Sequence, residues 1–127
     1  MNYIGFGNRC FNIPASEKII DLVFASKSEA ADIADFVIKA AEYLCAEIES
    51  YAGETPEMVF PDTTVTPVGG DEKMLIDNLI SDMNQSVAIR MEKPLNIVRI
   101  AKAHWNRLQF AGETEHNYIL FLWSTTA

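Results

Sequence analysis

The 127-residue sequence predicts a single α+β domain, in which one long helix packs across a face of a mixed, mainly antiparallel sheet of four to five strands. Three observations support this class. One long segment has the apolar spacing of a helix, several short segments have the composition of strands, and the length suits one hydrophobic core. Two shorter helices and a loop rich in Pro, Gly and Thr at residues 53–70 complete the domain, which spans residues 1–127.

The long helix is predicted over residues 26–51. Its apolar residues recur at steps of three and four, and acidic residues recur at the same steps on the opposite side. Ser26 and Glu29 have the spacing of a capping box at its start. Gly53 supplies a residue that tolerates a left-handed conformation just after its end.

The two shorter helices are predicted over residues 71–84 and 94–110. The first begins with acids and has an apolar stripe. For the second, a helical template fits better than strand alternation, and Pro94 suits its first turn. The sequence from Phe110 to Thr114 repeats the aromatic-Ala-Gly-Glu-Thr pattern found after the long helix, which favours a second helix end at this position.

The strands are predicted from four short segments. Residues 2–6 suit an edge strand or an ordered arm, and residues 18–25 suit a strand better than a short helix. Residues 86–92 alternate apolar and polar side chains, which is typical of a strand with one wet face. Residues 117–124 form a near-continuous apolar run, which predicts a central strand covered on both faces.

The charge of the chain is negative and unevenly distributed. The net charge is −8, and residues 1–82 hold fifteen of the eighteen acids, whereas residues 83–127 hold five bases and three acids. This balance opposes direct binding to nucleic acid or anionic membranes and permits a basic partner. The N-terminus lacks the pattern of a signal peptide and no apolar run reaches transmembrane length, so we expect a soluble, cytoplasmic protein with reduced Cys10 and Cys45.

No catalytic, cofactor or metal motif is present in the sequence, which favours a non-enzymatic function. The charge distribution predicts an inhibitor, immunity-type or adaptor protein that binds a basic partner protein, and it leaves self-association open. The predicted contact surface is the acidic side of the long helix, at Asp32, Asp35, Glu42 and Glu49. The simpler interpretation of this stripe is a solvated helix face.

The alternative function is a small enzyme or a ligand-binding domain for an anionic small molecule. Its candidate residues combine bidentate donors, a flat aromatic face and histidines with near-neutral pKa: Arg99, Lys102, His104, Trp105, Arg107 and His116. Helical spacing separates the basic residues from His104 and Trp105, which weakens this interpretation. The competing view is a buried Trp105 and a solvated basic face.

Overall fold

The computed structural model describes residues 1–6, 18–60, 66–70, 73–74, 76–78, 81, 94–100 and 107–125. It confirms the predicted α+β class. The elements in chain order are β1 (Asn2–Phe6), β2 (Lys18–Ser26), α1 (Ile33–Glu47), the 3₁₀ helix η2 (Glu49–Tyr51), α2 (Pro56–Val59), β3 (Thr66–Pro67), β4 (Val98–Arg99), β5 (Arg107–Glu113) and β6 (Asn117–Thr125).

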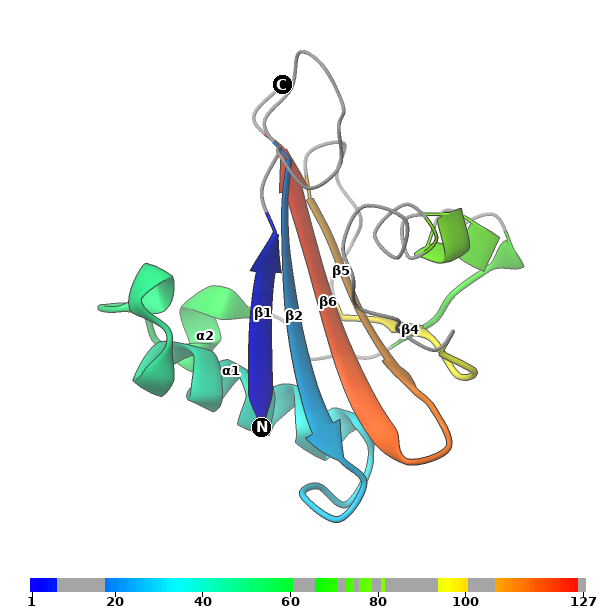
Figure 1. The fold of residues 1–127 in the computed structure, drawn as a ribbon, viewed down its shortest axis with the longest axis horizontal. Coiled ribbons are helices and arrows are strands. Elements are labelled where there is room, and N and C mark those ends of the chain that lie inside the picture. The colour runs from blue at the N-terminus through cyan, green and yellow to red at the C-terminus, as the bar shows by residue number, and fades with distance from the viewer. Residues whose placement is uncertain are drawn as a thin grey trace.

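The six strands form one antiparallel sheet in the order β1-β2-β6-β5-β4-β3 (Figure 1). β6 pairs with β2 along nine residues and with β5 along seven, which makes it the central strand, as its continuous apolar run predicts. Residues 18–25 are a strand and β1 is an edge strand. The strand predicted at residues 86–92 lies outside the described residues.

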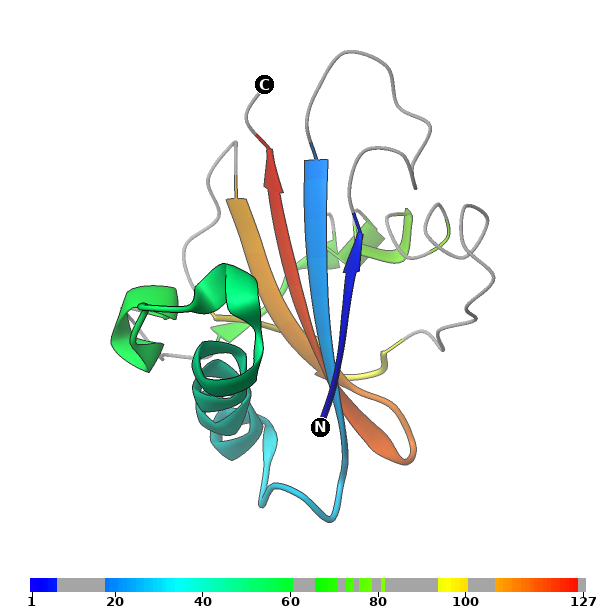
Figure 2. The same ribbon diagram turned by 60° about the vertical axis from the view of Figure 1, so that its left-hand side comes forward.

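The sheet buries apolar side chains on both of its faces. α1 crosses one face, and the described helical residues between 70 and 81 lie on the other (Figures 1 and 2). On the α1 side, Phe36 stacks on Tyr118 with ring centroids 5.4 Å apart. On the other side, Ile76 packs against Ile20 and Phe121. Alternate residues of β6 therefore serve two cores, which explains its composition.

α1 begins seven residues later than predicted. The side chain of Asp32 caps it by accepting a hydrogen bond of 2.8 Å from the backbone N–H of Asp35. Ser26 instead ends β2, and its N–H donates to the Glu29 carboxylate across the turn that follows. The hydrogen bond between Ser26 and Glu29 therefore stabilises the turn after β2 and does not mark the start of a helix. After α1 and η2, Gly53 has the left-handed conformation expected of it, with φ of 85°.

The helix predicted over residues 94–110 is wrong. The described part of this segment contains β4 and the start of β5, and the main chain of β5 pairs with β6 along seven residues. Hairpin pairing with β6, the next strand in the chain, overrides the helical spacing of a short apolar run. Gly112 lies inside β5 rather than after a helix, and a Cβ at this position would come within 2.6 Å of the Pro94 Cβ. The repeated pattern is therefore not a repeated helix end.

Two further predicted segments are partly described. Within residues 71–84, every described residue up to Ser81 is helical, as expected, and Ile76 is buried. The loop at residues 53–70 contains the helical turn α2, in which Thr55 caps the N-terminus and Pro56 occupies the first turn. In the part of the chain that the structure describes, no helix has the length and apolar character needed to cross a membrane.

Candidate functional site

The four predicted partner-binding acids divide into two pairs. Asp32 and Asp35 are engaged within α1, because Asp32 caps the helix and Asp35 Oδ2 accepts from the Ala31 N–H at 2.9 Å and pairs with Lys39 Nζ at 3.0 Å. The hydrogen bond from Ala31, followed by that from Lys39, lowers the pKa of Asp35.

The second pair, Glu42 and Glu49, is exposed to solvent. Neither forms an ion pair in the structure as described. Neither carboxylate accepts a hydrogen bond from a described residue of α1 or η2. Of the four predicted residues, they are the ones available to another molecule.

A groove of about 260 Å³ runs between α1 and α2, and it adds a fifth acid to this surface. Its floor contains the buried residues Ala41 and Phe60, and Ile38 at its side is 46% exposed. The exposed carboxylates of Glu42 and Glu57 also line it. The groove lining is completed by Pro56. The groove thus combines apolar surface with negative charge, as protein-binding surfaces do.

Glu57 was not predicted as a site residue because residues 53–70 were expected to form a loop. The available signal was the Thr55-Pro56-Glu57 sequence, in which a cap residue, a proline and an acid mark the start of a helix. In the structure, Thr55 Oγ1 accepts from the Met58 N–H at 3.3 Å. This turn places α2 beside α1.

The charge of this region is concentrated. Residues 32–60, which we call the helical layer, contain seven acids and only one base, Lys39, for a formal charge of −6. The layer lies on one face of the sheet (Figure 2). Most of the net negative charge inferred from the sequence therefore lies on one side of the described molecule, where the acids together attract positively charged groups.

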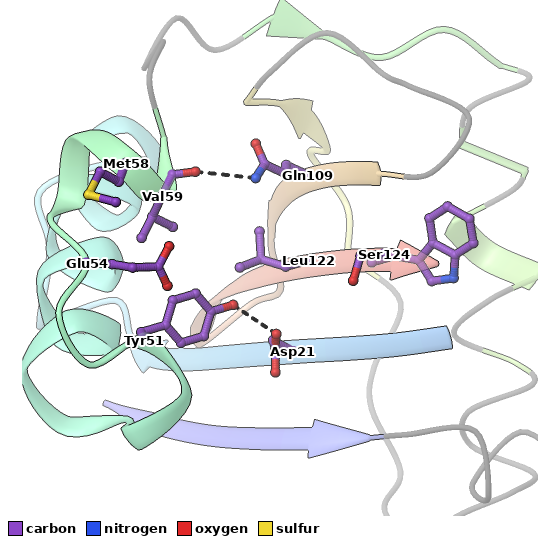
Figure 3. A pocket seen from close by; sticks show the side chains of 9 residues that line it. Asp21, Tyr51, Glu54, Met58, Val59, Gln109, Leu122 and Ser124 are labelled. Carbon is purple, nitrogen blue, oxygen red and sulfur yellow. Dashed lines mark hydrogen bonds between the residues drawn. The ribbon is translucent and has the colours of Figure 1, made fainter. Parts of the chain in front are cut away.

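A second concave site, which we call the Asp21 pocket, lies where η2 and α2 meet the sheet. Its volume is about 130 Å³. Asp21, Leu122 and Gln109 lie side by side on β2, β6 and β5, and they form its floor. Figure 3 shows the helical side chains that face them. The remaining lining residues are Tyr51, Glu54, Met58, Val59, Trp123 and Ser124.

Asp21 accepts hydrogen bonds from two tyrosines. The Tyr3 hydroxyl donates to Oδ1 at 2.5 Å and the Tyr51 hydroxyl donates to Oδ2 at 2.8 Å. Burial, followed by the hydrogen bond to Asp21, raises the pKa of Tyr3 to about 12. Burial and the Asp21 charge also raise the pKa of Tyr51. Both hydroxyls are therefore neutral donors near pH 7, and they tie η2 and β1 to β2.

The Asp21 pocket was also missed at the sequence level. Its residues come from β2, β5, β6 and the segment from η2 to α2, so no local spacing reveals it. The one signal was Asp21 itself, an acid inside the apolar run of β2. A charged residue that points toward a core face needs hydrogen-bonding partners there.

Three of the six alternative ligand-binding residues are described, and they lie in two strands and a turn. Arg99 lies in β4 beside Phe110, and Arg107 begins β5. His116 lies in the turn after β5, 79% exposed, with Nε2 3.8 Å from Glu115. The length of β5 separates Arg107 from His116. Lys102, His104 and Trp105 lie outside the described residues, so a ligand site at these positions stays a prediction.

Metal and thiol chemistry find little support in the described regions. No group of three or more His, Cys, Asp or Glu side chains there is placed to hold a metal ion. Cys45 is a partly buried free thiol. Burial, together with the charges of Glu54 and Glu57, raises its pKa, which disfavours the reactive thiolate.

Comparisons with protein-family models, with curated proteins and with solved structures found no match to this chain. The two concave sites and the charge of the helical layer are therefore the features that indicate a function.

Proposed function

We propose that this protein is a small acidic interaction factor, of the inhibitor, immunity or adaptor kind, that binds a basic partner protein through its helical layer. The observation that carries the proposal is the groove between α1 and α2, where the exposed Ile38 lies with the carboxylates of Glu42 and Glu57, which pair with no described residue. Apolar contact in such a groove supplies affinity. The surrounding negative charge speeds encounter with a basic partner and discriminates against acidic ones.

The role of each acid in the proposal follows from its surroundings. A carboxylate that already accepts hydrogen bonds within the fold, such as Asp32, must lose them before it can serve a partner. Glu42, Glu49 and Glu57 have no such bonds to described residues and lose only hydration. The proposed contact is therefore centred on these three residues rather than on the N-terminal acids of α1.

The charge of the layer also limits the partners. The formal charge of −6 on the helical layer repels phosphate groups, so the proposal includes no direct contact with nucleic acid or anionic membranes. Self-association through this layer is disfavoured, because two copies would bring like charges together. A cytoplasmic setting remains part of the proposal.

Affinity capture from an extract of the source organism tests this function. The immobilised wild-type protein is compared with Glu42→Lys, Glu57→Lys and the control Glu115→Lys, which makes the same charge change on the exposed β5–β6 turn. We expect a basic protein to be captured stoichiometrically by the wild type and the control. Each groove variant should reduce that capture about tenfold, the effect of roughly 1.4 kcal/mol. Equal capture by all four proteins would contradict the proposal.

A further inference from the structure

We infer that the Asp21 pocket binds a small organic cation, a guanidinium or alkylammonium group carried on a short aliphatic stem. This site is distinct from the groove between α1 and α2, and the inference does not depend on the proposed partner. It rests on the charge, the hydrogen-bonding groups and the size of the pocket.

Among the side chains that the structure describes, no cation compensates the charge of the pocket. Asp21 and Glu54 both line it, and neither forms an ion pair with any described residue. The partners of Asp21 are the neutral hydroxyls of Tyr3 and Tyr51. Each carboxylate oxygen has a second lone pair, so Asp21 can still accept from a ligand. Two carboxylates in a partly enclosed site favour a cation and exclude an anion.

The remaining polar groups of the pocket add acceptors. Gln109 is only 8% exposed, and its Nε2 donates to the Val59 carbonyl oxygen at 3.4 Å (Figure 3). Its amide oxygen has no hydrogen-bond partner among the residues that the structure describes. This oxygen is not one of the fully buried atoms without a partner, so it is an acceptor that a ligand N–H can reach. Ser124 supplies a hydroxyl at the open side.

The size and apolar surface of the pocket define the rest of the ligand. A volume of about 130 Å³ accommodates several water molecules or one small organic group. Leu122, Met58 and Val59 provide aliphatic surface beside the acceptors, as Figure 3 shows. A planar guanidinium or an ammonium group has only donors, and its methylene stem packs on such surface. The pocket therefore matches the end of a lysine or arginine side chain, or a free amine of similar size.

Titration followed by ¹H–¹⁵N NMR tests the inference. The probes are n-butylguanidinium, n-butylammonium and the neutral analogue n-butylurea. We expect the cations to cause saturable shifts in the Gln109 side-chain amide and the Tyr51 backbone amide, and the urea to cause none. Glu54→Gln should weaken cation binding about fivefold, as expected for loss of one partly exposed charge.

The matched control is Glu57→Gln, which removes the same charge from the neighbouring groove and should leave cation binding unchanged. Asp21→Asn is a second variant, and its fold is checked by the NMR spectrum because Asp21 also anchors two tyrosines. Equal shifts with n-butylurea, shifts that do not saturate, or undiminished binding to Glu54→Gln would overturn the inference.

The source of the cation is separated by one more probe, the capped peptide Gly-Arg-Gly. Binding of this peptide at least as tight as that of n-butylguanidinium assigns the pocket to a protein side chain, and binding of the free cation alone assigns it to a small molecule. Failure of both overturns the inference. Loss of partner capture on mutation of the groove is a separate result, because n-butylguanidinium reports on the Asp21 pocket alone.

Discussion

The N-terminal and C-terminal parts of the segment from Glu29 to Phe60 differ in what their acids contact. In the N-terminal part the acids bond within the fold: Glu29 pairs with the N-terminal ammonium group of Met1 at 2.9 Å, Asp32 caps α1, and Asp35 accepts from Ala31. In the C-terminal part the Tyr51 hydroxyl and the Val59 carbonyl oxygen make the hydrogen bonds to the sheet, and the acids there make no described ion pair.

This contrast shows that equal spacing of acids along a helix does not imply equal function. An acid near a helix N-terminus has unpaired backbone N–H groups beside it and binds them. An acid in the middle of α1, such as Glu42, has no such groups and remains free for another molecule.

Removal of the Tyr51 hydroxyl should lower the stability of the protein more than the loss of any acid discussed below. Tyr51→Phe deletes a hydrogen bond to a charged, partly buried carboxylate, so the free energy of unfolding should fall by about 1.5 kcal/mol. Tyr43→Phe is the matched control, since its hydroxyl makes no described hydrogen bond, and should change stability by less than about 0.5 kcal/mol. Urea denaturation measures both. An equal loss in the two variants would show that the Asp21 bond does not anchor η2.

Loss of the α1 cap should have a smaller effect. Asp32→Ala removes the hydrogen bond to the Asp35 N–H and should lower the free energy of unfolding by about 1 kcal/mol. Glu42→Ala, on the same helix and equally acidic, should stay within about 0.5 kcal/mol of the wild type. The same denaturation experiment distinguishes them. If Glu42→Ala proved the more damaging, the division between structural and free acids would fail.

The smallest expected effect is on how the stability depends on pH under acidic conditions. The hydrogen bond from the N-terminal ammonium group, followed by that from Ser26, lowers the pKa of Glu29. Because the folded-state pKa lies below the unfolded value near 4.3, this contribution to stability is complete above that pH and disappears as the pH falls further. The urea midpoint of Glu29→Gln should therefore depend less on pH below about 5 than that of the wild type. Glu115→Gln, as the control, should follow the wild type.

The sequence predicted those elements whose burial follows from the pattern of their own residues. Residues 117–124 are apolar on both sides of the strand, and only a central position buries both. The apolar stripe of α1, with Val37 and Leu44 buried, also follows directly from its spacing.

The parts that failed depend on partners outside the segment itself. β5 is a strand because it forms a hairpin with β6, the next strand in the chain, and the spacing within residues 94–110 does not reveal that pairing. Gly53 and Gly112 occupy the same short pattern for unrelated reasons. Gly53 needs a positive φ, whereas Gly112 leaves room for Pro94. A shared local pattern therefore did not mean a shared structure.

The candidate sites were predicted only in part for the same reason. Glu42 and Glu49 were identified because both were predicted on one face of a single helix, although the structure places Glu42 in α1 and Glu49 in η2. Glu57 and the Asp21 pocket were not, because α2 and the sheet reach them from other parts of the sequence.

Site-specific photo-cross-linking tests the central claim most directly. A photoreactive amino acid replaces Ile38 at the groove, which is 46% exposed, or Leu95, a more exposed apolar control at 69% outside the helical layer. In extracts of the source organism, we predict a discrete adduct with a basic protein from position 38 and none from position 95. Glu42→Lys should abolish that adduct. The absence of an adduct at position 38, or the same adduct from both positions, would contradict binding through the groove.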